Sequence, residues 1–216
     1  MALTRRAQHV ADTRGALVAA ARELFAERGY AGTGTEEIVA RARVTRGALY
    51  HHFRDKKDLF RAVMDGVARE AAEALVTREL THAQELPDEP WDQLRHGFQS
   101  FLDVCTTGDF QRIVLIDGPA VLGQDVWDQL VDEHGHGLLA EWLRKAMANG
   151  EIDELPVAPL ARLLAALISE ASLYTARAED PDTARRDAGK VIDRVLAGLR
   201  RTNAPEHPDH ESAVQV

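Results

Sequence analysis

The chain of 216 residues is 45% hydrophobic and 28% charged, as expected for a globular protein with one large domain or two small ones. One cysteine, Cys105, excludes an internal disulfide, and we expect a reducing, cytoplasmic setting because the N-terminus lacks a secretion signal. No apolar run approaches the roughly 18 residues of a membrane-spanning helix, so no membrane partner is expected.

The net charge of −9 is unevenly distributed along the chain. Residues 1–64 hold 12 Lys or Arg and 7 Asp or Glu, a net charge of +5, whereas residues 65–216 carry −14. This asymmetry is typical of a protein that approaches phosphate with one end only. The charge pattern alone is equally compatible with chance fluctuation, so DNA binding is inferred only together with the motifs below.

Apolar residues recur with helical spacing through most of the chain, and no segment shows the sustained alternation of a strand. The sequence therefore predicts an all-α fold of about nine helices. The first helix ends at Arg28, before a left-handed cap at Gly29. The later helices are expected at residues 33–42, 45–53, 55–81, 90–105, 110–116, 124–148 with a possible break at 135–137, 159–178 and 183–201. The helix at 110–116 is expected to stop at Gly118-Pro119.

Three regions follow from this pattern. We expect an N-terminal three-helix head at residues 1–64, a C-terminal helical body at residues 65–201, and a disordered tail at residues 202–216, which is polar and holds two prolines.

Residues 33–53 predict two short helices joined by a tight turn. Thr33 and Glu36 have the spacing of a capping box, and Thr45 is a second N-cap only three residues after Ala42. Helices so close together must cross steeply. Their shared core would consist of Ile38, Val44, Leu49 and Phe53. This is helix-turn-helix geometry, in which the second helix enters the major groove of DNA.

The second helix has an outward face made of Arg46, Gly47, Tyr50 and His51. Glycine inside a helix costs roughly 1 kcal/mol relative to alanine, which close approach to another backbone would explain. Exposed Tyr and His side chains suit phosphate and base-edge contacts. Lys56 opens the next helix, where its charge opposes the helix dipole, so a phosphate partner would explain it.

Each of these side chains also has a purely structural interpretation. Tyr50 could cover the helix beneath it, Lys56 could simply be solvated, and His51 and His52 could pack within the head.

This pattern resembles the TetR family of bacterial regulators. The resemblance covers about 50 residues, from Leu17 to Leu59, and its most specific part is the run Thr45-Arg46-Gly47-Ala48-Leu49-Tyr50-His51-His52-Phe53 with Lys56 after it. Two positions depart from the family: Val39 replaces a small Ala, and Arg43 replaces a Gly in the turn. Glycine adopts a positive φ there easily and arginine does so at a cost. Arg43 could also reach phosphate.

The resemblance implies a DNA-binding head that binds double-stranded operator DNA. Arg46 is the strongest candidate, because a bidentate Arg–guanine pair discriminates between bases by about 1–3 kcal/mol. Thr35 would contact phosphate, since Gly34 stands where the family often has Thr or Ser. Glu36 could accept from cytosine N4, although capping is the preferred interpretation. The predicted DNA-binding residues are Thr33, Thr35, Thr45, Arg46, Gly47, Tyr50, His51 and Lys56.

The body is expected to hold a small-molecule effector, again by resemblance. Apolar pockets with a few polar groups are the usual pattern for such sites. The candidate lining residues are Phe98, Phe101, Leu102, Cys105, Leu115, Trp127, Leu139, Trp142, Glu170 and Tyr174. Each could instead belong to the plain core. Glu170, if buried, would need a cation or a hydrogen-bond donor.

The last two helices, 159–178 and 183–201, are the candidate seam of a homodimer. Their apolar faces are wider than one packed face needs, and small residues permit close approach in a four-helix bundle across a two-fold axis. Burial of both faces within one subunit is the alternative.

The sequence thus predicts a repressor released from a palindromic operator by a small molecule, with the helix at 55–81 as the lever. An activator, or a ligand-binding protein of the same fold without operator binding, is the alternative. An enzyme is not predicted, because the chain lacks a Gly-rich phosphate loop, a Gly-x-Ser-x-Gly element and Cys/His zinc spacing. His134 and His136 do not share a helical face, so no metal or other cofactor is predicted.

Overall fold

The computed structural model describes residues 5–81, 90–131, 133 and 137–201. They form ten α-helices and one π-helix, which confirms the all-α prediction with slightly more helices than expected. The elements are α1 (Arg5–Arg28), α2 (Thr35–Ala42), α3 (Arg46–His52), α4 (Lys56–Thr81), α5 (Pro90–Cys105), η1 (Phe110–Asp117, the π-helix), α6 (Gly118–Leu122), α7 (Gln124–Val131), α8 (Gly137–Ala148), α9 (Val157–Arg177) and α10 (Pro181–Ala197).

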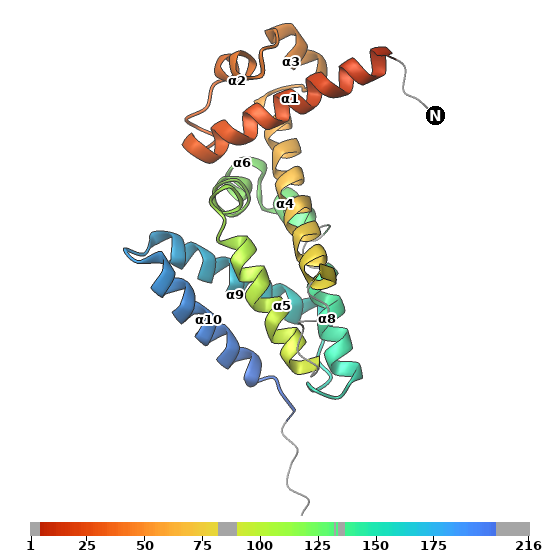
Figure 1. Ribbon diagram of the computed structural model, residues 1–216, viewed down its shortest axis with the longest axis vertical. Helices are drawn as coiled ribbons and strands as arrows, with labels where there is room; N and C mark the ends of the chain where they lie inside the picture. The colour runs from red at the N-terminus through yellow and green to blue at the C-terminus, as the bar shows by residue number, and fades with distance from the viewer. Residues whose placement is uncertain (1–4, 82–89, 132, 134–136, 202–216) are drawn as a thin grey trace, which may run out of the picture.

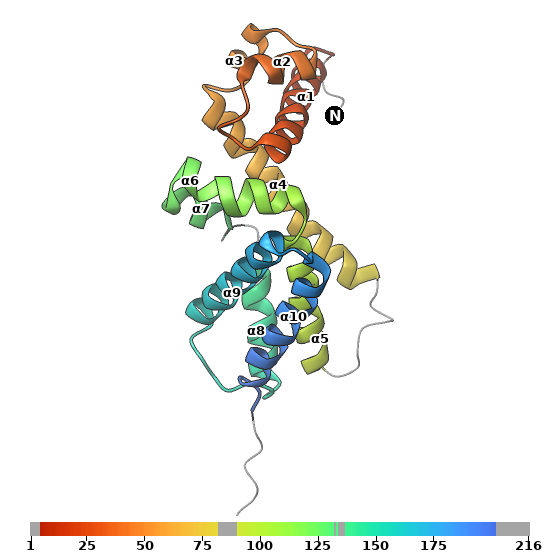
Figure 2. The ribbon, with the colours of Figure 1, turned by 90° about the vertical axis from the view of Figure 1, so that its left-hand side faces the viewer.

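The helices fall into two groups along the long axis of the molecule. Helices α1, α2 and α3 form a head at one end, and α5, α8, α9 and α10 form the far end of the body (Figure 1). Helix α4 runs from the head into the body, so it belongs to both. The second view places η1, α6 and α7 directly beneath the head (Figure 2). The expected boundary at residue 64 therefore falls inside α4.

The head is held together by apolar side chains at helical spacing on α1. Leu17, Leu24 and Phe25 are buried, and they pack against residues of α2, α3 and α4. The Phe25 and Phe60 rings meet edge to face with centroids 5.2 Å apart, and Tyr30 lies 5.2 Å from Phe60. Full burial of one such side chain stabilises a fold by about 1.5–3 kcal/mol. This small core fixes where α3 lies.

The body is built around α9, which packs against α5, α8 and α10. Ile168 and Leu164 of α9 are buried in it. Two partly exposed ion pairs join α10 to α5: Arg185 donates to Asp103 at 2.8 Å, and Arg95 donates to Asp193 at 3.0 Å. By length and composition α9 could also cross a membrane, and 28% of its most apolar stretch of 18 residues is buried within this chain. Much of its apolar surface is thus uncovered.

One expected helix boundary is wrong, and one expected break coincides with a division between helices. The helix expected to stop at Gly118-Pro119 instead continues from η1 directly into α6. Proline is tolerated there because it lies in the first turn of α6, where its missing N–H has no partner to lose. The segment expected at 124–148 with a possible break at 135–137 is divided into α7 and α8; Gly137 opens α8, and residues 135 and 136 lie outside the described residues.

Strand pairing is confined, within the described ranges, to an isolated bridge between Ile152 and Arg200. It ties the chain after α8 to the end of α10. The expected disordered tail at 202–216 lies outside the described residues.

Candidate nucleic-acid interface

Helix α3 is fixed by its first residue and by one buried side chain. The Thr45 hydroxyl accepts a hydrogen bond from the N–H of Ala48 at 3.2 Å, which confirms the N-cap expected there. Leu49 is fully buried, in contact with the core that α1 and α2 share. Because Leu49 points inward, the opposite side of this short helix faces solvent. Arg46, Gly47 and Tyr50 are all exposed on it.

The turn between α2 and α3 holds a strained residue. Arg43 has φ 56 and ψ 40, the left-handed conformation that glycine adopts most easily. Among the described residues it is the one non-glycine with a positive φ. The N–H of Val44 then donates to the Val39 carbonyl at 3.0 Å and closes the end of α2. The positive φ expected from the sequence at Arg43 is thus confirmed.

The outward face of α3 is polar and open. The Arg46 guanidinium donates to the Glu36 carboxylate at 2.8 Å and lies over the Tyr50 ring at 5.6 Å. Both charged side chains remain largely exposed, so the pair contributes little to folding. A Cβ atom at Gly47 would meet only the Thr45 hydroxyl, at 3.8 Å. Packing within the chain therefore does not require a glycine at 47.

The two histidines that end α3 differ in exposure. His51 is exposed, whereas His52 is partly buried, and their rings lie 5.2 Å apart edge to face. Burial lowers the pKa of His52, and the neighbouring His51 and Arg14 lower it further. His52 is therefore neutral at pH 7. His51 alone of the two is placed to meet a partner of the outward face.

Lys56 has partners inside the head that residue spacing did not reveal. Its ammonium donates to the carbonyl oxygens of Tyr30 and Thr33, both at 2.9 Å, and lies 4.0 Å from the centroid of the Tyr30 ring. These acceptors explain the lysine at the start of α4 without a phosphate. The Lys56 charge opposes the dipole of α4, but its two hydrogen bonds attach the loop between α1 and α2 to the start of α4.

Thr33 is not the N-cap of α2, so that part of the prediction is wrong. Gly34 holds the cap position, and Glu37, not Glu36, completes the capping box by accepting from the Gly34 N–H at 3.1 Å. Thr33 is 2% exposed, and its hydroxyl lies 2.9 Å from the Gly29 carbonyl and 3.1 Å from the Leu24 carbonyl. Its side chain cannot reach DNA. Thr35, half-buried, is the first residue of α2.

The head is also bound to the body through η1. Arg22 of α1 donates to Asp109 at 2.6 Å and to Glu70 of α4 at 2.5 Å. The N–H of Tyr30 donates to Asp117, the last residue of η1, at 2.7 Å. Burial by itself would raise the pKa of Asp109, but the hydrogen bonds from Arg22 outweigh it and hold that pKa below its usual value. Nothing in the sequence indicated the pairs Arg22–Asp109 and Tyr30–Asp117, because in each the partners lie 87 residues apart.

Most of the predicted effector-binding residues form a packed core. Phe98, Leu102, Cys105 and Leu139 are fully buried, and Trp142 packs on Phe98 with ring centroids 6.4 Å apart. The remaining partly buried members are Phe101, Leu115 and Trp127. Trp127 is fixed by a hydrogen bond from Nε1 to the Val114 carbonyl at 2.6 Å. Burial raises the pKa of the Cys105 thiol far above its ordinary value, so the thiol is protonated and unreactive.

Glu170 and Tyr174 do not line a cavity within the chain, which corrects the prediction for both. The Glu170 side chain is 72% exposed and lies 4.0 Å from Arg177, and Tyr174 is 58% exposed. Both lie on α9 and are exposed to solvent. Glu170 is therefore not a buried carboxylate that needs a cation or a donor.

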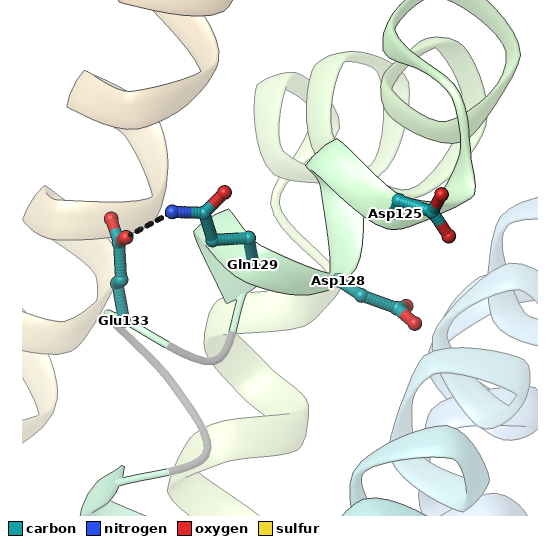
Figure 3. A pocket seen from close by; sticks show the side chains of 4 residues that line it. All are labelled: Asp125, Asp128, Gln129 and Glu133. Carbon is teal, nitrogen blue, oxygen red and sulfur yellow. Dashed lines mark hydrogen bonds between the residues drawn. The ribbon is translucent and has the colours of Figure 1, made fainter.

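The body also has an open acidic depression of about 530 Å³, lined by Asp125, Asp128, Gln129 and Glu133. Figure 3 shows Asp125 and Asp128 pointing away from Glu133, which accepts from Gln129 at 3.0 Å. Asp128 is paired with Arg162. Carboxylates so dispersed do not build a cation site, and no group of three metal-binding side chains occurs in the part of the chain that the structure describes.

Two family profiles match the chain, and together they cover most of it. Residues 17–63 match the profile described as "Bacterial regulatory proteins, tetR family", and residues 91–199 match "Tetracyclin repressor-like, C-terminal domain". The chain belongs to the TetR family. It is therefore a transcriptional regulator with a helix-turn-helix head, and it is not an enzyme.

Solved structures of TetR-family proteins extend the likeness over the whole fold. A TetR-family transcriptional regulator from Pectobacterium atrosepticum is 31% identical, with a TM-score of 0.73 over 93% of this chain and 99% of that one. Another from Mesorhizobium loti has a TM-score of 0.69 over 92% of this chain and 100% of that one, at 21% identity. The second likeness shows the fold alone.

Curated relatives match over shorter stretches. The regulator AcrR of Shigella flexneri is 32% identical over 108 residues, which are 50% of this chain and 48% of AcrR. The repressor BepR of Brucella suis is 36% identical over 104 residues, or 48% of each chain. The activator FasR of Mycolicibacterium smegmatis is 45% identical over 53 residues, or 24% of each chain. This chain thus spans about half the length of the first two relatives and less of the third.

Proposed function

We propose that this protein is a homodimeric repressor that binds a palindromic operator through α3 and leaves it when a small molecule binds the body. The proposal divides the chain into a DNA-binding domain at 1–64 and a ligand-binding and dimerisation domain at 65–201. The name of BepR supports repression. The name of FasR supports activation instead, and the position of the operator relative to the promoter decides between the two.

The observation that carries DNA binding is the outward face of α3. It exposes a guanidinium, a phenol and an imidazole beside a glycine that packing within the chain does not require. Arg46, Tyr50 and His51 can reach base edges and phosphates, while Gly47 lets the duplex backbone approach the helix closely. Thr35 and Thr45, at the starts of α2 and α3, remain proposed phosphate contacts. A gel shift with the DNA upstream of the gene tests this, with a scrambled duplex as the control.

Apolar surface on α9 and α10 supports a homodimer. Leu163 is 69% exposed and Val191 57% exposed, and Val195 and Tyr174 are also exposed. Large apolar side chains in such numbers usually mark an interface. Two copies of this helix pair would form a four-helix bundle across a two-fold axis. To meet half-sites one duplex turn apart, the two recognition helices of such a dimer would have to lie roughly 34–36 Å apart. A membrane surface is the competing occupant of this apolar face. A dimer found by sedimentation in the absence of lipid would favour a second copy of the chain over a membrane.

Contacts between head and body support control by an effector. Helix α4 connects the two directly, and η1 adds a second connection through Arg22 and Asp109 and through Tyr30 and Asp117. The pairs with η1 hold α1 and the loop that follows it, so a shift of η1 in the body would tilt the head. A ligand that prefers one body arrangement changes operator affinity by its differential binding, typically about 1–3 kcal/mol.

The buried lining residues define where we expect that ligand. Phe98, Leu102 and Cys105 lie on α5, and η1 begins five residues after Cys105. A ligand entering between α5 and α8 would displace Trp142, which rests on Phe98 and on Gly97. Cys105 should resist a thiol reagent in the free protein and react faster when a candidate effector opens the packing between α5 and α8; an unchanged rate with an effector that alters operator binding would place the site elsewhere.

A further inference from the structure

The guanidinium of Arg46 is held from two sides before any DNA is present. Its Nη1 donates to the Glu36 carboxylate at 2.8 Å, and its Cζ atom lies 5.6 Å from the centroid of the Tyr50 ring. Arg46 is the first residue of α3, Tyr50 lies one turn further along, and Glu36 comes from α2 (Figure 1). The side chain proposed to recognise a base is thus oriented in the free protein.

The stability of α2 does not account for Glu36. A carboxylate in the first turn interacts well with the helix dipole, but Glu37 already does so. Glu37 also satisfies the Gly34 N–H and pairs with Arg28 at 2.6 Å. A carboxylate beside the DNA-facing side of α3 repels phosphate, which weakens binding to any duplex. The contact that the Glu36 carboxylate does make is the ion pair with Arg46.

We propose that Glu36 is a positioning residue that orients Arg46 for bidentate recognition of a base, an inference that rests on the proposed DNA binding. Arginine has five N–H donors, and Glu36 takes one on Nη1, which leaves those on Nη2 and Nε for guanine O6 and N7. A preoriented guanidinium loses less rotamer freedom on binding. The carboxylate also offsets a charge that would otherwise attract any phosphate, so specificity rises while non-specific affinity falls.

Selection of duplexes from a random library tests this, because the chain itself then picks the sequence that it prefers. The full chain is compared with the variants Glu36→Ala, Glu36→Gln and Arg46→Ala, and circular dichroism confirms that each is folded. The matched control is Glu23→Ala, which also removes an exposed acid from an ion pair in the head, that with Arg41 at 2.7 Å. The readouts are the base preference at each position and the affinity for non-specific DNA.

We expect Glu36→Ala and Arg46→Ala to lose preference at the same base pair, by about fivefold or more, while Glu23→Ala keeps the preference of the unmodified chain. Glu36→Gln, which retains an acceptor, should keep part of it. Glu36→Ala should bind non-specific DNA more tightly. An unchanged preference in Glu36→Ala, or a loss at a different base pair from Arg46→Ala, overturns the inference. If the unmodified chain itself selects no common sequence, the proposed function fails instead.

Discussion

Two residues of the head occupy positions that their own residue types disfavour. Arg43 occupies a left-handed position at the end of α2 that glycine would fill with less strain. Lys56 sits at the positive end of a helix dipole yet has two carbonyl acceptors. Both residues lie within about one turn of α3, so each affects how the recognition helix is held.

Replacing Arg43 by glycine should stabilise the protein. The left-handed conformation costs an L-residue roughly 1–2 kcal/mol, and part of this is offset by the greater freedom of glycine in the unfolded chain. We expect a gain of about 0.5–1 kcal/mol in the free energy of unfolding, measured with urea. Ala40→Gly, in the helical part of α2, should instead lose roughly 1 kcal/mol. A loss in both variants would mean that the Arg43 side chain stabilises the turn.

Replacing Lys56 by methionine should destabilise the head. The carbonyls of Tyr30 and Thr33 would lose a charged donor, which costs about 1–3 kcal/mol and lowers the melting temperature. Lys57→Met, at an exposed neighbouring position, should melt like the unmodified chain. If Lys56 acts as a plain phosphate contact, its loss would leave melting unchanged and reduce the salt slope of DNA binding by about one.

At the scale of elements, the helices themselves could be predicted from hydrophobic spacing, but their junctions could not. Thr45 was recognisable as an N-cap because the cap and its donor are local. The cap of α2 was misassigned because Thr33 can also satisfy its hydroxyl by reaching back to Gly29 and Leu24, which a one-dimensional pattern does not show. Glu170 was assigned to a cavity because an apolar sequence does not show which side of α9 packs within the chain and which side stays exposed.

The pairing of η1 with α1 could not be predicted either, because a pattern along the sequence does not show contacts between distant segments. Asp109→Asn should keep the cap of η1, since asparagine also accepts from the Phe110 N–H, but should weaken the pair with Arg22. We expect a smaller change in operator affinity on adding effector. Glu70→Gln, which removes the pair between Arg22 and α4, separates the two connections between head and body. Equal effector responses in both variants and the unmodified chain would rule out either ion pair as a coupling element.

The same aspartate gives a pH dependence. Its folded pKa lies below the unfolded value of about 3.9, so its stabilising contribution is fully present above that pH and is lost as the pH falls through the folded pKa. The difference in unfolding free energy between the unmodified chain and Asp109→Asn should therefore be constant at neutral pH and shrink below about pH 4. A difference that grows on acidification would contradict the lowered pKa.

At the scale of the whole molecule, the uncovered side of α9 and α10 predicts a dimer. Val195 and Val76 are each 42% exposed, but only Val195 lies on the proposed seam. Val195→Asp should bury an unpaired carboxylate in the dimer and shift the protein to monomer, because that burial costs several kcal/mol. Val76→Asp, on α4, should leave the dimer intact. Sedimentation equilibrium measures the oligomeric state of both variants. If the unmodified chain is a monomer, α9 and α10 do not form a dimer interface.

The head is basic and the body acidic, so electrostatics favour the approach of DNA to the head, and the dimer would present that head twice. The most direct test is fluorescence anisotropy of a labelled palindrome, selected by the chain itself, at a series of stated salt concentrations. We expect two chains to bind each duplex, with an affinity that falls steeply as salt rises and drops at least about tenfold in Arg46→Ala. Equal affinity for the palindrome and a scrambled duplex, unaffected by Arg46→Ala, would contradict the claim that α3 reads DNA.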